Sequence, residues 1–402
     1  MTDRYFPNNY FDYRNETYLT SNNHLIPEVG SSIAHWIEQQ TDRLERHLHQ
    51  TDPTNFSVYT GSTGIALLYL RLSILFSNKK DAYKSKAKAL VDSSLAQLSG
   101  KRISFLSGDP GPLAIAAVIY RDLGDDRIVR KCIDKLVSIK EDALSDSKPD
   151  EYLNGRAGYL YALMFVRNEL GNDTIDKQLV IDIFEAMIKS GEKYARESGS
   201  HSPLMYQWHD SEYLGAAHGV SGIIYLLLKV ACDDSFSSLR QYVNSHLLPT
   251  IEFLKTKRLP SGNYLSSSGS QSDKLVQWCH GAPGFVYLFN RAFEITNNQS
   301  YLELAVSAGE VVWERGLLRK GYGLCHGTAG NGYVFLDLFR TTKQSKWLHR
   351  AIKFAEHCMD SDKHELSRTA DRPYSLFEGL AGTLYFMCDV MNPTQARFPA
   401  FE

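Results

Sequence analysis

The sequence predicts an all-α protein, an α/α toroid in which seven inner helices are surrounded by seven outer helices. A Gly-x-x-Gly step followed by an apolar run recurs seven times in the 402 residues. The segments between the steps are amphipathic at helical spacing; for example, Ile128, Cys132 and Leu136 recur every four residues. Helices that are apolar all round need a covering layer, and seven such hairpins close most simply into a ring.

The repeat is regular in position. Its seven steps begin at Gly61, Gly108, Gly155, Gly219, Gly281, Gly327 and Gly379. Successive steps lie 46 to 64 residues apart, which is enough for two helices and their connections. An open solenoid is the alternative, but its terminal repeats should carry a polar outer face, which the run GTLYFM in the last repeat lacks.

The repeat also predicts the domain organisation. We expect one domain over residues 1–402, in which residues 1–58 form an N-terminal arm and the first outer helix. Residues 59–402 then hold the seven repeats. A length that first suggests two or three domains is therefore explained by one repeated unit.

Composition excludes several classes of function. Lys and Arg number 44 against 46 Asp and Glu, so the formal charge of -2 gives no basic surface for nucleic acid. No apolar stretch approaches the ~18 residues of a membrane helix. Six cysteines are too few for a disulfide scaffold. We expect a cytoplasmic protein without an integral membrane segment, with peripheral association with the plasma membrane left open.

Polar residues precede every step, and parallel helices of one layer would bring all seven to the same rim. The residues are Thr60, Ser107, Asn154, His218, His280, His326 and Glu378. We expect the first three to cap helices, because Ser, Thr and Asn are preferred there. Histidine is a poor cap, so the three histidines need another explanation.

Two adjacent steps are preceded by Cys-His, namely Cys279-His280 and Cys325-His326. Thiolate and imidazole are the ligands that zinc favours, and three protein ligands would leave a fourth position open. The alternative is that these are buried packing residues, but duplication at one phase of the repeat favours a metal site. Spacing alone does not choose between the two histidines. The other cysteines, Cys132, Cys232, Cys358 and Cys388, lie in helical patterns and are expected to pack in the core.

At these motifs the chain resembles the lanthionine synthetase cyclase family, and specifically the eukaryotic LanC-like proteins. The shared segments are RYFPN, SPLMYQW, GAAHG, WCHGAPG, RKGYGLCHG, SLFEGLAGT and ARFPAFE, which span essentially the full length. The resemblance implies the same seven-over-seven toroid. It also implies Zn(II) ligands at Cys279, Cys325 and His326. Glutathione contacts are implied at Lys320, Arg368, Thr369, Ala370 and Asp371, with Arg4 as an addition.

The resemblance also implies a proton-transfer residue. His218 matches the histidine that acts as acid or base in the bacterial cyclases, and His280 is the second candidate. The bacterial cyclases have Tyr at the position of His280. An acidic partner for the histidine aligns near Glu151.

The implied function is zinc-dependent addition of glutathione to electrophiles, such as dehydroalanine or dehydrobutyrine residues in proteins, with formation of a thioether. The alternative is a glutathione-binding redox sensor or adaptor that binds signalling proteins. A third hypothesis is a terpene cyclase or glycosidase. The sequence argues against it, because it has no aspartate-rich metal motif and no pair of carboxylates at the rim beyond the isolated Glu378.

Overall fold

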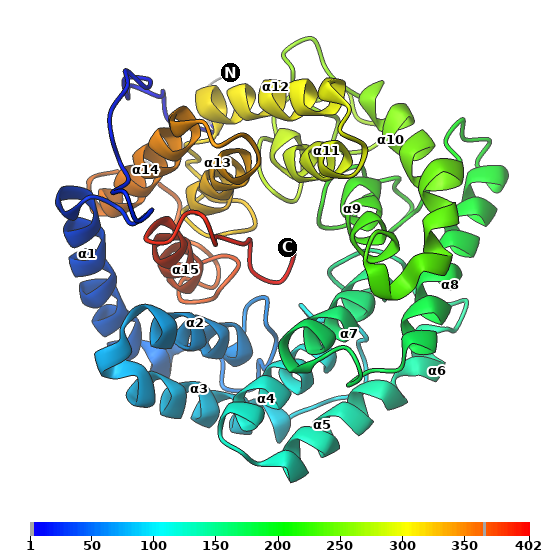
Figure 1. Cartoon of the computed structure of the whole chain (residues 1–402), viewed down its shortest axis with the longest axis horizontal. Helices are drawn as coiled ribbons and strands as arrows, with labels where there is room; N and C mark the ends of the chain where they lie inside the picture. The colour runs from blue at the N-terminus through cyan, green and yellow to red at the C-terminus, as the bar shows by residue number, and fades with distance from the viewer. Residues whose placement is uncertain (1–3, 365–366) are drawn as a thin grey trace.

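The computed structural model describes residues 4–364 and 367–402, and these form two concentric rings of helices (Figure 1). The described residues form no β-strand beyond isolated bridges. The seven inner helices are α2 (Ser62–Leu75), α4 (Pro110–Asp122), α7 (Arg156–Leu170), α9 (Val220–Ala231), α11 (Ala282–Thr296), α13 (Thr328–Thr342) and α15 (Leu380–Val390). Each begins at one of the Gly-x-x-Gly steps, as the repeat predicts.

The outer ring covers the inner one. Its helices are α1 (Pro27–Arg46), α3 (Lys80–Leu95), α5 (Asp126–Ser138), α8 (Lys177–Glu197), α10 (Leu248–Lys255), α12 (Gln299–Arg315) and α14 (Ser345–Met359). A π-helical segment, η4 (Val243–Leu247), runs directly into α10. The remaining short helices are α6 (Lys140–Ala143), η1 (Leu48–Gln50), η2 (Ser77–Lys79), η3 (Asp234–Arg240) and η5 (Ser361–Lys363).

The two rings differ in burial as their sequences require. In α9 nearly every residue is buried, whereas in α5 Val129, Cys132 and Leu136 form a single buried stripe. The Asp125 side chain caps α5 by accepting a hydrogen bond from the backbone N–H of Ile128 at 3.1 Å. A helix apolar all round is stable in water only inside a second layer, which the outer ring supplies.

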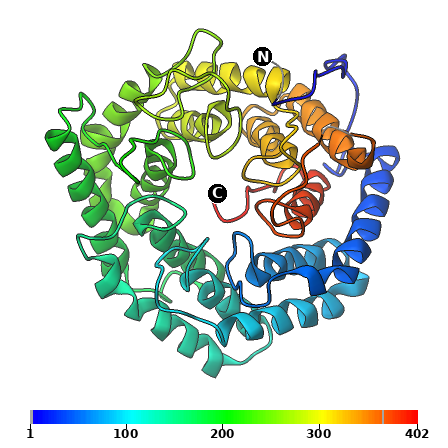
Figure 2. The same ribbon diagram turned by 180° about the vertical axis from the view of Figure 1, so that it is seen from behind.

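The ring is closed. The last inner helix, α15, packs against both α2 and α1, so the seventh repeat contacts the first (Figures 1 and 2). The toroid is confirmed and the open solenoid is wrong. Among the described residues, no helix combines the length and apolar character that crossing a bilayer requires.

Close backbone approach explains the second glycine of each step. A Cβ on Gly330 would lie 1.8 Å from the carbonyl oxygen of Leu324, and one on Gly382 would lie 1.9 Å from that of Leu376. Among the seven first glycines, all of which are described, Gly281 alone has a positive φ, of 94°. Close approach is therefore the general reason for glycine here.

The capping prediction for Thr60, Ser107 and Asn154 is wrong. The N-cap residues of α2 and α7 are the glycines that follow Thr60 and Asn154, and neither helix has a side-chain cap. The N-cap residue of α4 is Asp109, two residues after Ser107. The Thr60 hydroxyl instead accepts a hydrogen bond from the Asn55 amide at 2.9 Å. These polar residues belong to the loops at the rim.

Backbone hydrogen bonds link successive turns around this rim. Each involves the residue two positions before the first glycine of a step. The N–H of Cys279 donates to the carbonyl of Cys325 at 3.4 Å, and that of Cys325 donates to Phe377 at 2.8 Å. Phe377 donates to Tyr59 at 3.0 Å, and Tyr59 to Leu106 at 2.9 Å. This register brings side chains at one repeat phase together, across the closure of the ring.

Candidate metal and thiol site

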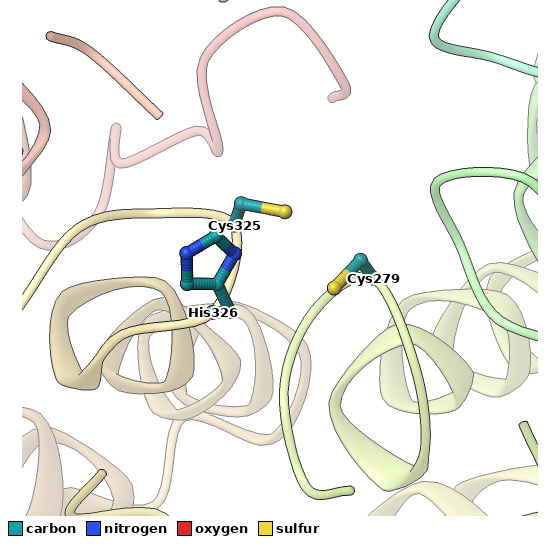
Figure 3. A group of neighbouring side chains, drawn as sticks. All are labelled: Cys279, Cys325 and His326. Atoms are coloured by element: carbon teal, nitrogen blue, oxygen red, sulfur yellow. The ribbon is translucent and has the colours of Figure 1, made fainter. Parts of the chain in front are cut away.

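Three side chains from two neighbouring turns form a compact group of donor atoms. Cys279 lies in the turn before α11, and Cys325 and His326 lie in the turn before α13. Their sulfur and ring-nitrogen atoms all lie within 4.8 Å of one another. Figure 3 shows the side chains converging on the space between the two turns. Both cysteines are buried and His326 is half-buried, and together they could hold a metal ion.

The two thiols shift each other's pKa in opposite directions. The Cys325 thiol donates a hydrogen bond to the Cys279 sulfur, which lowers the pKa of Cys279 well below the usual thiol value. The same bond and burial raise the pKa of Cys325. Cys279 is thus the sulfur that ionises first, and His326 and His280 both favour its thiolate.

Two neighbours of the thiols were not found from the sequence. The Gln277 amide donates to the Cys279 sulfur at 3.1 Å. The Tyr59 hydroxyl lies against Cys325, and burial together with the nearby thiolates raises the pKa of Tyr59 well above 10.0. Tyr59 stands at the same repeat phase as the two cysteines, and this position was the only signal for it.

His218 lies at the same rim and is paired with a carboxylate. Its Nδ1 lies 2.8 Å from Glu151 Oε2, and Glu151 is almost fully buried. The backbone N–H groups of Leu153 and Asn154 also donate to the Glu151 carboxylate, at 2.7 Å and 2.5 Å. Glu151 is therefore held in place by the turn and orients the His218 ring through Nδ1. The structure thus brings His218 together with Glu151, near which the resemblance places an acidic partner.

His280 is not part of the donor group. Its Nδ1 is buried and finds no hydrogen-bond partner among the described residues. The ring of Tyr213 contacts both histidines, with ring centroids 5.7 Å from His280 and 5.9 Å from His218. Trp208 stacks beside His218 at 6.4 Å. Both histidines thus face one aromatic side chain at the rim.

A cationic cavity adjoins the donor group. It has a volume of about 370 Å³, and Gln277, which contacts the Cys279 sulfur, also lines it. Five cationic residues line this cavity: Arg4, Lys274, Arg319, Lys320 and Arg368. The sequence predicted Arg4, Lys320 and Arg368 as binding residues but missed Lys274 and Arg319. The signal for Arg319 was its position next to Lys320.

Backbone pairing explains why cations far apart in sequence meet here. The N–H of Arg319 donates to the carbonyl of Arg4 at 3.0 Å, and the N–H of Arg368 donates to the carbonyl of Arg319 at 2.8 Å. The N-terminal arm is further held by Phe6, whose N–H donates to Leu317 at 2.7 Å. The arm therefore forms one wall of the cavity.

The predicted glutathione contacts from Arg368 to Asp371 do not all line one cavity. Thr369 and Ala370 line a neighbouring cavity of about 370 Å³, which also contains Arg368 and Glu378. Asp371 is largely exposed and lies 3.5 Å from the Arg368 guanidinium. The structure thus gathers Arg4, Lys320 and Arg368 in one cavity and leaves Asp371 outside the described lining of both.

The fold and the donor group together define a class of protein, a helical toroid with thiol and imidazole donors at one rim. A sequence model of the family described as lanthionine synthetase C-like protein matches residues 52–402. Glutathione S-transferase LANCL1 of Danio rerio is 40% identical over 385 residues, which cover 94% of this chain and 93% of that protein. The chain belongs to the lanthionine synthetase C-like family.

A solved structure agrees in fold. Nisin cyclase superimposes with a TM-score of 0.65 at 17% sequence identity, and the match covers 90% of this chain and 94% of that one. At this identity the likeness shows the fold alone, and the fold is the α/α toroid that the repeat predicts.

Proposed function

We propose that the chain is a zinc-dependent transferase that adds the glutathione thiolate to electrophilic carbons. The electrophiles would be dehydroalanine or dehydrobutyrine residues in proteins, and the product would be a thioether. One observation carries the proposal: a three-donor thiol and imidazole group adjoins a cationic cavity through the shared residue Gln277. The printed name of the Danio rerio relative, a glutathione S-transferase, supports the choice of thiol.

The donor group fits zinc. Two thiolates and one imidazole are a ligand set typical of zinc sites that keep an open fourth position. Zn–S bonds of about 2.3 Å in a tetrahedron put the two sulfurs about 3.8 Å apart. The donor atoms of Cys279, Cys325 and His326 lie within 4.8 Å of one another, so small side-chain movements would bring all three to bonding distance from a zinc ion. A bound zinc ion would hold the glutathione sulfur as a thiolate and orient it.

The cationic cavity provides for the rest of the glutathione molecule. Glutathione carries two carboxylates, and carboxylates are recognised by Arg and Lys through charge-assisted hydrogen bonds. Arg4, Lys320 and Arg368 line the cavity together, and the backbones of Arg4 and Arg368 are both hydrogen-bonded to Arg319, which precedes Lys320. They would hold the carboxylates of glutathione. Its sulfur would reach the donor group on the side of the cavity where Gln277 lies.

His218 would supply the proton that completes the addition. As the sulfur forms a bond to the β-carbon, the carbon–carbon π bond breaks and its electron pair moves toward the α-carbon and the adjoining carbonyl. Protonated His218 would then donate a proton to the α-carbon, with Glu151 holding the ring through Nδ1. His280 is the second candidate, because its Nδ1 is buried without a partner among the described residues.

The test is direct. The purified protein is incubated with glutathione and a dehydroalanine peptide, and the glutathione adduct is followed by mass spectrometry against a reaction without protein. Adduct formation well above the uncatalysed rate supports the proposal. If glutathione binds but the adduct forms only at the uncatalysed rate, the transferase proposal fails and the sensor or adaptor takes its place.

A further inference from the structure

The last seven residues of the chain lie inside the ring of inner helices, where a cavity of about 370 Å³ remains beside them. In both views the C-terminus lies at the centre of the ring (Figures 1 and 2). Ala396, Phe398, Ala400 and Phe401 are each at most 3% exposed. Helix α15 ends at Val390, on the rim away from the thiols, so this segment enters the bore from the opposite rim. We call residues 396–402 the tail.

Polar contacts fix the tail to the inner helices. Arg340 of α13 donates hydrogen bonds to the carbonyl of Ala396 and to the Glu402 carboxylate. Glu402 also accepts from the N–H of Phe398 at 2.8 Å, and Asp389 of α15 accepts from the N–H of Arg397 at 3.1 Å. The tail is thus held at its beginning and at its end, with its two phenylalanines between.

Those phenylalanines pack against a set of aromatic side chains inside the ring. Phe398 stacks on Trp278 with ring centroids 5.1 Å apart and planes 18° apart. Phe401 lies edge-on to Trp278 at 5.3 Å and tilted against Tyr152 at 5.2 Å. The Tyr152 hydroxyl donates to the carbonyl of Phe401 at 3.2 Å. Phe377 lies 6.1 Å from Phe398 and 5.6 Å from Trp278.

Three aromatic partners of the tail, Trp278, Tyr152 and Phe377, are chain neighbours of a site residue or are bonded to one. Its other aromatic partners are residues of the inner helices α9, α11 and α13, namely Tyr225, Tyr287 and Tyr333. Trp278 immediately precedes Cys279, and Tyr152 immediately follows Glu151. The carbonyl of Phe377 accepts the backbone hydrogen bond of Cys325. The backbones that carry both thiols and the carboxylate of the His218 pair therefore rest on one aromatic layer, and the tail supports that layer from below.

We propose that the tail is the floor of the thiol site, with Phe398 and Phe401 as positioning residues for Cys279, Cys325 and Glu151; this proposal takes the zinc-dependent transfer proposed above as given. A metal site needs its ligands held within a few tenths of an ångström, and residues behind the ligands supply that order. Removing a supporting ring opens space into which Trp278 can move, and Cys279 moves with it.

The test uses full-length variants with a matched control. Phe398→Ala and Phe401→Ala are compared with Phe184→Ala, which removes an equally buried phenylalanine from the outer helix α8. Zinc affinity is measured by competition with a chromophoric chelator, and the reactivity of Cys279 is measured by alkylation and peptide mass spectrometry on the metal-free protein.

We expect similar losses of Tm in all three variants. Only the tail variants should lose zinc affinity, by about tenfold or more, the range that supporting residues behind metal ligands show. They should also change the alkylation rate of Cys279 and lower kcat with little change in the KM for glutathione. Phe401→Leu, which keeps most of the volume, should recover much of the affinity and serves if an alanine variant does not fold.

Tail variants with the zinc affinity and alkylation rate of Phe184→Ala would overturn the proposal. The outcome is separable from the proposed function. If the wild-type protein binds no zinc or makes no adduct, the function fails, whereas the floor is still decided by the alkylation rates of the metal-free proteins.

Discussion

The two rims of the toroid are built from the same helices but differ in what joins them. At the rim where the inner helices end, most connections are short: only Asn297 and Asn298 separate α11 from α12. The exception is the connection from α9 to α10, which contains η3 and η4. At the rim where the inner helices begin, they are long, and the connection from α10 to α11 spans residues 256–281. The thiols, the cationic cavity and the His–Glu pair all lie at the long-loop rim. The candidate site is thus built on the longer loops, and the helices hold those loops in place.

The largest effect should come from the thiol at the centre of the long-loop rim. Cys325→Ala removes one of the three proposed zinc ligands, so both the formation and the orientation of the glutathione thiolate should be lost, and we expect the adduct rate to fall by about 1,000-fold. The rate is measured together with bound zinc. Cys132→Ala, a buried cysteine of the outer helix α5, should keep both. Retention of stoichiometric zinc and activity in Cys325→Ala would refute the assignment.

The glycines offer a test of stability at the two rims. Gly330→Ala forces a Cβ to 1.8 Å from the Leu324 carbonyl, and we expect it to lower the free energy of unfolding by about 3 kcal/mol. Gly124, between α4 and α5 at the short-loop rim, has a φ of 76° and nothing within 4 Å of its Cβ position. Gly124→Ala should cost about 1 kcal/mol. If urea denaturation gave equal losses in the free energy of unfolding for the two variants, close backbone approach would not be the reason for glycine at the site rim.

The His–Glu pair at the site has a counterpart outside it. His218→Asn should lower kcat by about 100-fold, because general acid catalysis contributes that much, while zinc stays bound. His246 pairs with Glu192 at 2.7 Å on the outer wall, and His246→Asn should leave kcat unchanged. Unchanged turnover in His218→Asn would show that His218 is not the proton donor and would leave His280 or water in that role.

The smallest effect concerns the short-loop rim, where the tail is anchored. Burial raises the pKa of Asp389 from 3.8 to about 6. The folded protein therefore binds the proton more tightly than the unfolded chain, and stability falls as pH rises through this range. We expect this carboxyl to lower the free energy of unfolding by about 2 kcal/mol between pH 4 and pH 6. Asp389→Asn should lack this component in denaturation curves at both pH values, and an identical pH dependence would contradict it.

The sequence predicted the fold because one local motif, the Gly-x-x-Gly step, recurs seven times. Each glycine step marks the start of an inner helix, and the phase of the repeat placed Cys279 and Cys325 at equivalent positions. The phase of the repeat could not show whether His326 or His280 joins the two cysteines, because that depends on the direction of each side chain. His326 turns toward the thiols, whereas His280 packs against Tyr213.

Contacts between distant segments were beyond the reach of the sequence. Arg4 reaches the cationic cavity through backbone pairing with Arg319, more than three hundred residues away. The tail supports Trp278 from the far end of the chain. The cap prediction for residues such as Thr60 was wrong because the glycine itself begins the helix. Residue preference describes local structure, and these features are set by ring closure.

The central claim is that Cys279, Cys325 and His326 bind zinc and leave one position for the sulfur of glutathione. X-ray absorption at the zinc edge, on the purified protein with and without glutathione, tests it most directly. We predict a shell with two sulfurs and one imidazole nitrogen from the protein, which gains a third sulfur when glutathione is added. A zinc-free protein, or a shell that glutathione leaves unchanged, would contradict the account.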